Sequence, residues 1–187
     1  MRAGLIAAAS AAAVIAAAWL PFFIAAPGTV RALHYQIGNM PDSALRALGV
    51  SSAYTPQWDR LGQIVVACVL ALIAISRGRW PAVLLLGAGA RIALDPGVHG
   101  YYTPGILLGA LLWDLLGSRR PVPIWTIVSF CALNLVPLAT ANDEVRGDFR
   151  LHLVVAFTLV ILAGPDRWVW RPESIKAQAQ PGEPATA

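Results

Sequence analysis

A cation, an acid, an imidazole and two phenols follow one another at the end of an apolar run. They are Arg91, Asp95, His99, Tyr101 and Tyr102. A guanidinium group offers paired N–H donors that match the oxygens of a phosphate or a carboxylate. These residues therefore predict a binding site for a lipid phosphate or another anionic headgroup, with Arg91 making the main contact.

A simpler interpretation stays open for two of these residues. Arg91 precedes Asp95 by one helical turn, so the two can pair along one helix while the arginine extends toward the membrane surface. His99 stands alone in a short Gly- and Pro-rich segment, which is more typical of a loop histidine than of a general base.

Two further polar residues interrupt apolar runs, where polar groups are expensive to place. Asp114 either extends toward Arg119 or Arg120 at a membrane boundary or forms, with Asn134, the polar part of a transport pathway. Asn134 and Pro137 together also predict a kinked helix with a side-chain hydrogen bond to a neighbouring helix.

The acids that are candidates for catalysis are Asp42 and Asp59, which precede the second apolar run and are not adjacent. The sequence contains no phosphate-binding loop, nucleophile elbow or zinc-binding histidine pair. Cys68 and Cys131 each lie within an apolar run without metal-ligand spacing. We therefore expect no metal and no cofactor, and the class of enzyme, if any, is left to the resemblance described below.

The composition places these residues in a membrane. Hydrophobic residues make up 57% of the chain and charged residues 13%, whereas soluble domains contain about 25% charged residues. The basic residues are dispersed between apolar runs, which argues against a nucleic-acid partner. A spanning helix needs about 20 apolar residues. We predict an all-α transmembrane bundle of about six spans, at residues 3–26, 61–76, 80–94, 101–117, 122–141 and 151–164.

These spans form one predicted domain, residues 1–171, with an outer loop at 27–60 and a charged loop at 142–150. Within the outer loop, Asp42 or Ser43 can cap a short helix that Gly49 would end. Residues 172–187 lack apolar periodicity and predict a disordered cytoplasmic tail. The first span is either a retained helix or a cleaved signal peptide.

The basic residues predict the orientation of the bundle. Arg77, Arg79, Arg119 and Arg120 fall in the two tight turns after the second and fourth spans, and basic turns stay in the cytoplasm. Both termini are therefore expected inside. Lys176 is the only lysine beside many Arg, Ala, Gly and Pro residues, a usage that suggests a GC-rich bacterial genome. We expect a multi-pass protein of a bacterial cytoplasmic (inner) membrane, in contact with membrane lipids.

Gly105 and Gly109 form a GxxxG pattern within the fourth span. Small residues at this spacing allow two helices to approach closely. The pattern predicts close packing that is either internal or with a second chain, in a homodimer or with another protein.

Three segments together resemble a known family. They are Arg91 to Pro96, then Tyr101-Tyr102-Thr-Pro-Gly105, then Leu-Leu-Trp113-Asp114-Leu. They are similar to the C-terminal membrane helices of actinobacterial polytopic proteins related to GT-C glycosyltransferases, which are mannosyltransferase-like and depend on polyprenyl-phosphate sugars. The resemblance covers residues 27–164 and implies a polyprenyl-phosphate lipid as a candidate partner.

This chain departs from the pattern of that family in two ways. The family has eight or more spans and catalytic acids in its first outer loop, whereas this chain has about six spans and only the separated Asp42 and Asp59. The resemblance therefore implies a truncated or non-catalytic relative. We expect a non-enzymatic interaction or lipid-handling protein of cell-envelope assembly. A lipid-linked glycosyltransferase and a small transporter are the alternatives.

Overall fold

The structure, a computed structural model, describes residues 2–28, 31, 35–97, 100–118 and 121–164. Every regular element within these residues is helical, which confirms the all-α prediction. The chain divides into two compact units, Met1–Ile37 and Gly38–Ala187. The predicted tail at residues 172–187 lies outside the described part of the chain.

Unit 1 contains helix α1, Arg2–Ala25, which matches the predicted first span. Large apolar side chains along it are exposed, among them Val14 at 69% and Phe22 at 62%. The ring of Trp19 stacks on that of Phe23 with centroids 6.1 Å apart. Within its described residues, α1 makes up most of this unit, and both alternatives for the first span stay predictions.

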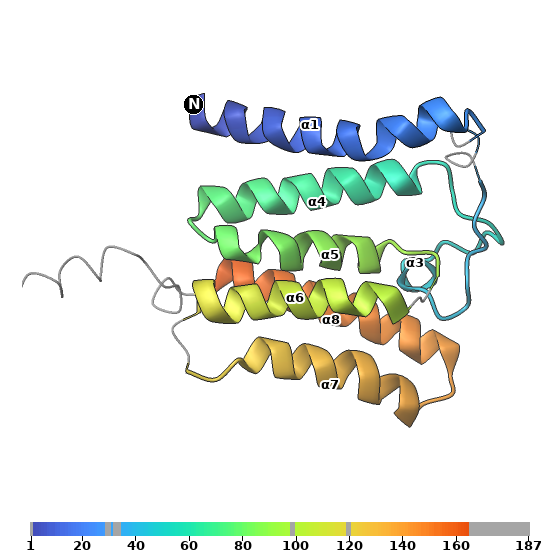
Figure 1. Ribbon diagram of the computed structural model, residues 1–187. Coiled ribbons are helices and arrows are strands. Elements are labelled where there is room, and N and C mark those ends of the chain that lie inside the picture. The colour runs from blue at the N-terminus through green and yellow to red at the C-terminus, as the bar shows by residue number, and fades with distance from the viewer. Residues whose placement is uncertain (1, 29–30, 32–34, 98–99, 119–120, 165–187) are drawn as a thin grey trace, which may run out of the picture. The chain divides into compact units, whose positions relative to one another are not determined.

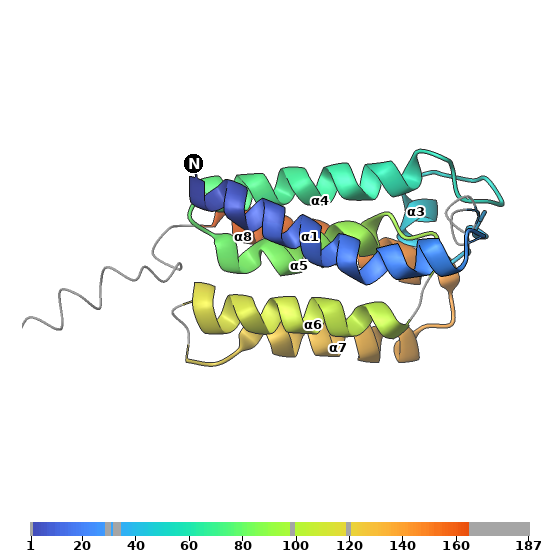
Figure 2. The ribbon, with the colours of Figure 1, turned by 45° about the horizontal axis from the view of Figure 1, so that its top comes forward.

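Unit 2 is a bundle of helices that lie alongside one another (Figures 1 and 2). Its longer helices are α4 (Asp59–Ser76), α5 (Val83–Ala93), α6 (Thr103–Leu112), α7 (Ile124–Ala139) and α8 (Asp143–Ala163). A single turn, α3 (Ala44–Ala47), lies near the start of α8 and the end of α5. We call this the α3 end of unit 2, and the end with the turn between α4 and α5 the opposite end.

Short turns of other helical types lengthen two of these helices. The 3-10 turn η1, Trp80–Ala82, leads into α5. The 3-10 turn η2, Gly100–Tyr102, leads into α6, and the π-helical segment η3, Trp113–Gly117, continues it. The predicted third and fourth spans therefore correspond to helical runs that combine several types of turn.

The predicted loop at residues 142–150 is wrong. Helix α8 begins at Asp143, so these charged residues form its first two turns. The side chain of Asn142 accepts hydrogen bonds from the N–H groups of Glu144 and Val145. An asparagine cap followed by acids is favourable at a helix N-terminus, where N–H groups are unpaired. The charges start the helix, although they had indicated a loop.

Helix α5 is the centre of unit 2, since it packs against α3, α4, α6 and α8. Leu85 and Leu86 on it are 1% and 2% exposed. A Cβ atom on Gly109 of α6 would lie 2.6 Å from the backbone of Leu85. A Cβ atom on Gly105 of α6 would lie 3.7 Å from the Cβ atom of Ala88 on α5, which is an ordinary contact distance. The surface of Gly105 and Gly109 therefore packs against α5 of the same chain, which is the first of the two kinds of packing that the GxxxG pattern predicts.

The turn after α4 holds the C-terminus of α8. Arg79 donates to the carbonyl oxygens of Ile161 and Gly164, and Arg77 donates to that of Leu162. Arg79 is only 4% exposed. The last carbonyl groups of a helix lack helical donors and attract positive charge. Two of the four arginines that predict the orientation of the bundle, Arg77 and Arg79, are thus also caps for α8.

Helix length supports only part of the membrane prediction. Within the described residues, α4 alone is long and apolar enough to cross a membrane. Shorter apolar helices cover Ala12–Ala25, Trp80–Ala93, Thr103–Gly117 and Ile124–Ala139. The six-span bundle therefore stays a prediction.

Candidate functional site

Arg91 joins three elements at the α3 end. Its Nη1 atom donates to Oε1 of Gln63 on α4, and its Nη2 atom donates to the hydroxyl of Tyr102 in η2 at 2.7 Å. Its guanidinium lies 5.0 Å from the centroid of the Tyr102 ring, and Nη2 lies 3.9 Å from Oδ1 of Asp95. The predicted pairing with Asp95 is confirmed. Both terminal nitrogens of Arg91 are already occupied within the chain, so it acts first as a link between helices.

Asp59 is a buried partner of this cluster. It is 1% exposed, and its Oδ2 atom accepts a hydrogen bond of 2.8 Å from Gln63. Its Oδ1 atom has no hydrogen-bond donor among the described residues. Gln63 also donates to the backbone carbonyl of Leu94, at 3.1 Å. Gln63 thus ties α4 to the end of α5, and this residue was not recognised in the sequence.

Asp42 makes a separate set of contacts, with α8. Nη1 of Arg150 lies 3.2 Å from the carbonyl oxygen of Asp42 and 3.9 Å from its Oδ2 atom. The chain can approach α8 here because of Gly147, where a Cβ atom would lie 2.6 Å from the carbonyl oxygen of Ser43. The two acids proposed for catalysis therefore belong to different contacts.

The loop before α4 that carries Asp42 is held together by buried polar groups. Ser43 caps α3 by accepting a hydrogen bond from Arg46 N–H, and Gly49 ends the turn with a φ of 89°. Asn39, 5% exposed, donates to the carbonyls of Val50 and Ser52. The predicted capped turn is confirmed. The loop is thus a defined structure that positions Asp42 against α8.

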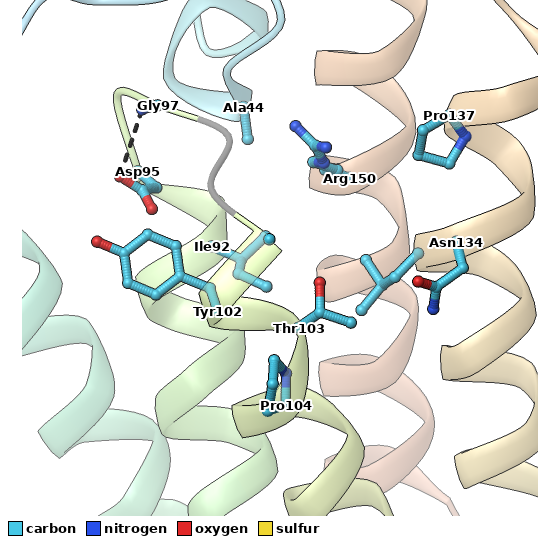
Figure 3. A pocket seen from close by; sticks show the side chains of 12 residues that line it. Ala44, Ile92, Asp95, Gly97, Tyr102, Thr103, Pro104, Asn134, Pro137 and Arg150 are labelled. Atoms are coloured by element: carbon cyan, nitrogen blue, oxygen red, sulfur yellow. Dashed lines mark hydrogen bonds between the residues drawn. The ribbon is translucent and has the colours of Figure 1, made fainter.

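A cavity of about 390 Å³ opens beside these contacts (Figure 3). Five polar residues line it, each from a different element. They are Asp95 directly after α5, Tyr102 in η2, Thr103 in α6, Asn134 in α7 and Arg150 in α8. Its apolar lining comes mainly from Ile92, Pro104, Leu133 and Pro137. The cavity therefore combines a charged part with a hydrocarbon-like part.

Arg150 is the cation of this cavity. Its side chain is 13% exposed, and its guanidinium points into the space near Ala44 (Figure 3). Burial lowers the pKa of Arg150, while the carboxylate of Asp42 opposes that shift. An arginine pKa starts so high that the group stays charged at neutral pH. The cavity therefore presents a permanent positive charge.

The predicted ligand residues are only partly assembled here. Asp95 and Tyr102 line the cavity, whereas Arg91 contacts them from the α4 side. His99 and the side chain of Tyr101 lie outside the described residues. Arg150 was missed because it stands far along the sequence, next to a predicted span.

Asp114 lies in η3 against the first turn of α7, whereas Asn134 lies in the second half of α7. The carboxylate of Asp114 accepts from the N–H groups of Trp125 and Thr126 and from the hydroxyl of Thr126. It therefore caps the first turn of α7. Asn134 donates to the carbonyl of Phe130 in its own helix, so the predicted side-chain hydrogen bond to a neighbouring helix is wrong, and the residue lines the cavity. Arg119 and Arg120, the partners proposed for Asp114, lie outside the described residues.

No protein-family model, no curated protein and no solved structure matches this chain. The resemblance to GT-C-related proteins therefore stays a prediction.

Proposed function

We propose that this chain is a multi-pass protein of a bacterial cytoplasmic membrane, with both termini inside, and that it handles lipids without catalysing a reaction. The observation that carries this proposal is the reversed polarity of the bundle. Its helices expose apolar side chains while several of its charged groups are buried.

Helix α4 illustrates the reversal. Leu61, Ile64 and Leu72 are 65%, 60% and 66% exposed, whereas Asp59 and Gln63 on the same helix are 1% and 6% exposed. A helix on the surface of a soluble protein has the opposite arrangement, with its charged face in water. Extended apolar surfaces mark contact with a membrane or a protein partner. The same pattern on several helices favours a surrounding lipid phase.

Helices α7 and α8 also expose large apolar side chains. Leu138 on α7 is 83% exposed and Leu159 on α8 is 60% exposed. At the opposite end, Arg79 and Asp114 are 4% and 5% exposed. The shorter helices are compatible with spans because a bilayer thins locally around a short apolar segment.

The lipid-handling role is favoured over the two alternatives by the state of the polar groups. As a glycosyltransferase base, Asp42 would have to leave its ion pair with Arg150, and Asp59 would have to leave a buried contact with Gln63. As part of a transport pathway, Asp114 would have to leave the first turn of α7. The cavity at the α3 end needs no such rearrangement to accept a ligand.

The proposed membrane location is tested by fractionation and labelling. We expect the full chain to stay in the membrane pellet after alkaline carbonate and to dissolve in detergent. In a background with Cys68→Ala and Cys131→Ala, a single cysteine at Ser52→Cys or Ser76→Cys reports the side of the membrane. A membrane-impermeant maleimide should label Ser52→Cys in intact spheroplasts and Ser76→Cys only after lysis. Recovery in the aqueous fraction, or labelling of Ser76→Cys in intact cells, would overturn the proposal.

A further inference from the structure

Two charged side chains line the cavity within the described part of the chain, one of each sign. They are Arg150 on α8 and Asp95 after α5. The lining therefore carries one charge of each sign on different elements (Figure 3), and each charge also has an ion-pair partner outside the lining, Arg91 for Asp95 and Asp42 for Arg150. A balanced site favours a ligand that itself carries both charges, because each charge is then matched without leaving a net charge in a poorly hydrated place.

Arg150 retains hydrogen-bonding capacity. Its Nη1 atom is used by Asp42, while Nε and Nη2 make no hydrogen bond within the described residues. Two such nitrogens on one guanidinium match two oxygens of a phosphate. Asp42 is not among the residues that line the cavity, whereas Arg150 is. The positive part of the lining is therefore suited to a phosphate group.

The rest of the polar lining supplies acceptors. Asp95 contributes a carboxylate, and its Oδ1 atom also accepts the N–H of Gly97 at 3.3 Å. Asn134 uses its Nδ2 atom in its own helix, which leaves its amide oxygen for another donor. Pro137 has no N–H group, so the carbonyl of Leu133 loses its helical donor. These oxygens suit an ammonium group that carries several N–H donors.

Apolar side chains continue from the cavity along two helices. Pro104 lines the cavity, and Leu108, one turn further along α6, is 54% exposed. Asn134 lines it from α7, where Phe130, one turn away, and Ile127, two turns away, are 52% and 49% exposed. Residues three or four positions apart share one face of a helix. A hydrocarbon chain that leaves the cavity can therefore lie on these side chains.

We propose that the cavity binds the headgroup of a zwitterionic aminophospholipid. The phosphate contacts Nε and Nη2 of Arg150, the ammonium group contacts Asp95, and an acyl chain follows the apolar stripes of α6 and α7. This assignment rests on the proposed membrane function and gives that function a ligand class. It also moves the main phosphate contact from Arg91, the residue expected from the sequence, to Arg150.

The proposal predicts a headgroup preference. The full chain, extracted from membranes in a mild non-ionic detergent, is mixed with equal amounts of phosphatidylethanolamine, phosphatidylglycerol and phosphatidylcholine of identical acyl chains. Native mass spectrometry then measures the fraction of protein that retains each lipid. We expect phosphatidylethanolamine to be retained at least fivefold more than the others, because the glycerol headgroup lacks a cation and the choline headgroup lacks N–H donors.

Variants of the two charged residues should change this preference in different directions. Arg150→Gln should lower retention of both phosphatidylethanolamine and phosphatidylglycerol about tenfold, and Arg150→Lys, which keeps the charge but not the fork of donors, should lie between. Asp95→Asn should abolish the preference for the amine and raise retention of phosphatidylglycerol to at least that of phosphatidylethanolamine. A residue with a purely structural role would not reverse the order of two lipids.

Matched controls lie on α8 close to Arg150. Arg146 donates to the carbonyls of Pro137 and Thr140, and its Nη1 atom lies 3.7 Å from Oδ1 of Asp143. Neither Arg146 nor Asp143 lines the cavity. Arg146→Gln and Asp143→Asn make the same changes of charge as the test variants. They should leave the order of lipid retention unchanged, although Arg146→Gln also releases the carbonyl of Pro137, which lines the cavity.

Several outcomes would overturn the proposal. Equal retention of the three lipids by the unmodified chain would reject the headgroup assignment. If Arg150→Gln does not fold, unchanged lipid retention in both Asp95→Asn and Arg150→Lys would reject it as well. Displacement of the lipid by water-soluble phosphoethanolamine at the same concentration would reject a lipid as the ligand. A membrane-extracted protein with no headgroup preference refutes this inference alone, whereas recovery from the aqueous fraction refutes the proposed membrane function.

Discussion

The two ends of unit 2 treat buried charge differently. At the opposite end, Arg79 and Asp114 are both buried, and each is bound to the terminus of a helix whose partial charge has the opposite sign. At the α3 end, Asp59 has one carboxylate oxygen without a donor, and Arg150 has two nitrogens without an acceptor among the described residues. At the opposite end both terminal nitrogens of Arg79 and both carboxylate oxygens of Asp114 have partners at helix termini, whereas the corresponding groups of Asp59 and Arg150 are only partly used.

This difference separates structural charge from charge that is available to a ligand. A buried polar group without a partner costs free energy, so a fold retains it only where something compensates. Carbonyl and N–H groups at helix termini need partners in any case, so Arg79 and Asp114 are explained by the fold. Arg150 is not fully explained in that way, and it lines the cavity.

The largest effect is expected at Arg79. Arg79→Ala should lower the free energy of unfolding by about 3 kcal/mol, because two carbonyl groups at the end of α8 lose a charged donor. Unfolding by sodium dodecyl sulfate in mixed micelles measures this change. Arg77→Ala is the control, since exposed Arg77 donates to one carbonyl and should cost about 1 kcal/mol or less. Equal losses in the two variants would contradict the distinction between the two arginines.

A smaller effect is expected at Asp114. Its carboxylate accepts three hydrogen bonds from Trp125 and Thr126, and an amide would turn a donor toward one of those donors. Asp114→Asn should therefore cost about 2 kcal/mol in the same unfolding assay. Thr126→Val, which removes only the hydroxyl, should cost about 1 kcal/mol. A stable Asp114→Asn protein would show that the cap of α7 does not depend on the charge.

The smallest effect is expected for the same chemical change at the α3 end. Asp59→Asn keeps the acceptor for Gln63 and alters only the oxygen that has no donor. The free energy of unfolding should change by less than about 1 kcal/mol, because no hydrogen bond is lost. If Asp59→Asn destabilised the protein as much as Asp114→Asn, both carboxylates would depend equally on their hydrogen bonds. That result would contradict the difference drawn between the two ends of unit 2.

The helices were predictable because apolar runs are a local property of the chain. The runs at residues 61–76 and 122–141 match α4 and α7 to within two residues at each boundary. The predicted start of the last helix is wrong, because a run of charges between two apolar segments indicates a loop. The asparagine at position 142 and the acids after it are themselves signals of a helix start.

The candidate site was predictable only where its residues are close in sequence. Arg91, Asp95 and Tyr102 were identified together because they fall at the end of one helix and the start of the next. Gln63 is uncharged and lies within an apolar run, so the sequence did not mark it as a residue of the site. The partners of Arg150 and Asp114, namely Asp42 and the first turn of α7, cannot be deduced from spacing.

The sequence by itself determined the all-helical class and the positions of most helices, because the spacing and length of apolar runs act within each segment. It also located the polar residues that interrupt those runs. Only the tertiary structure decided which of them are helix caps and which line a cavity, because that depends on which helix ends meet. Asp114 meets the start of α7, whereas Arg150 meets a loop more than a hundred residues earlier, at Asp42.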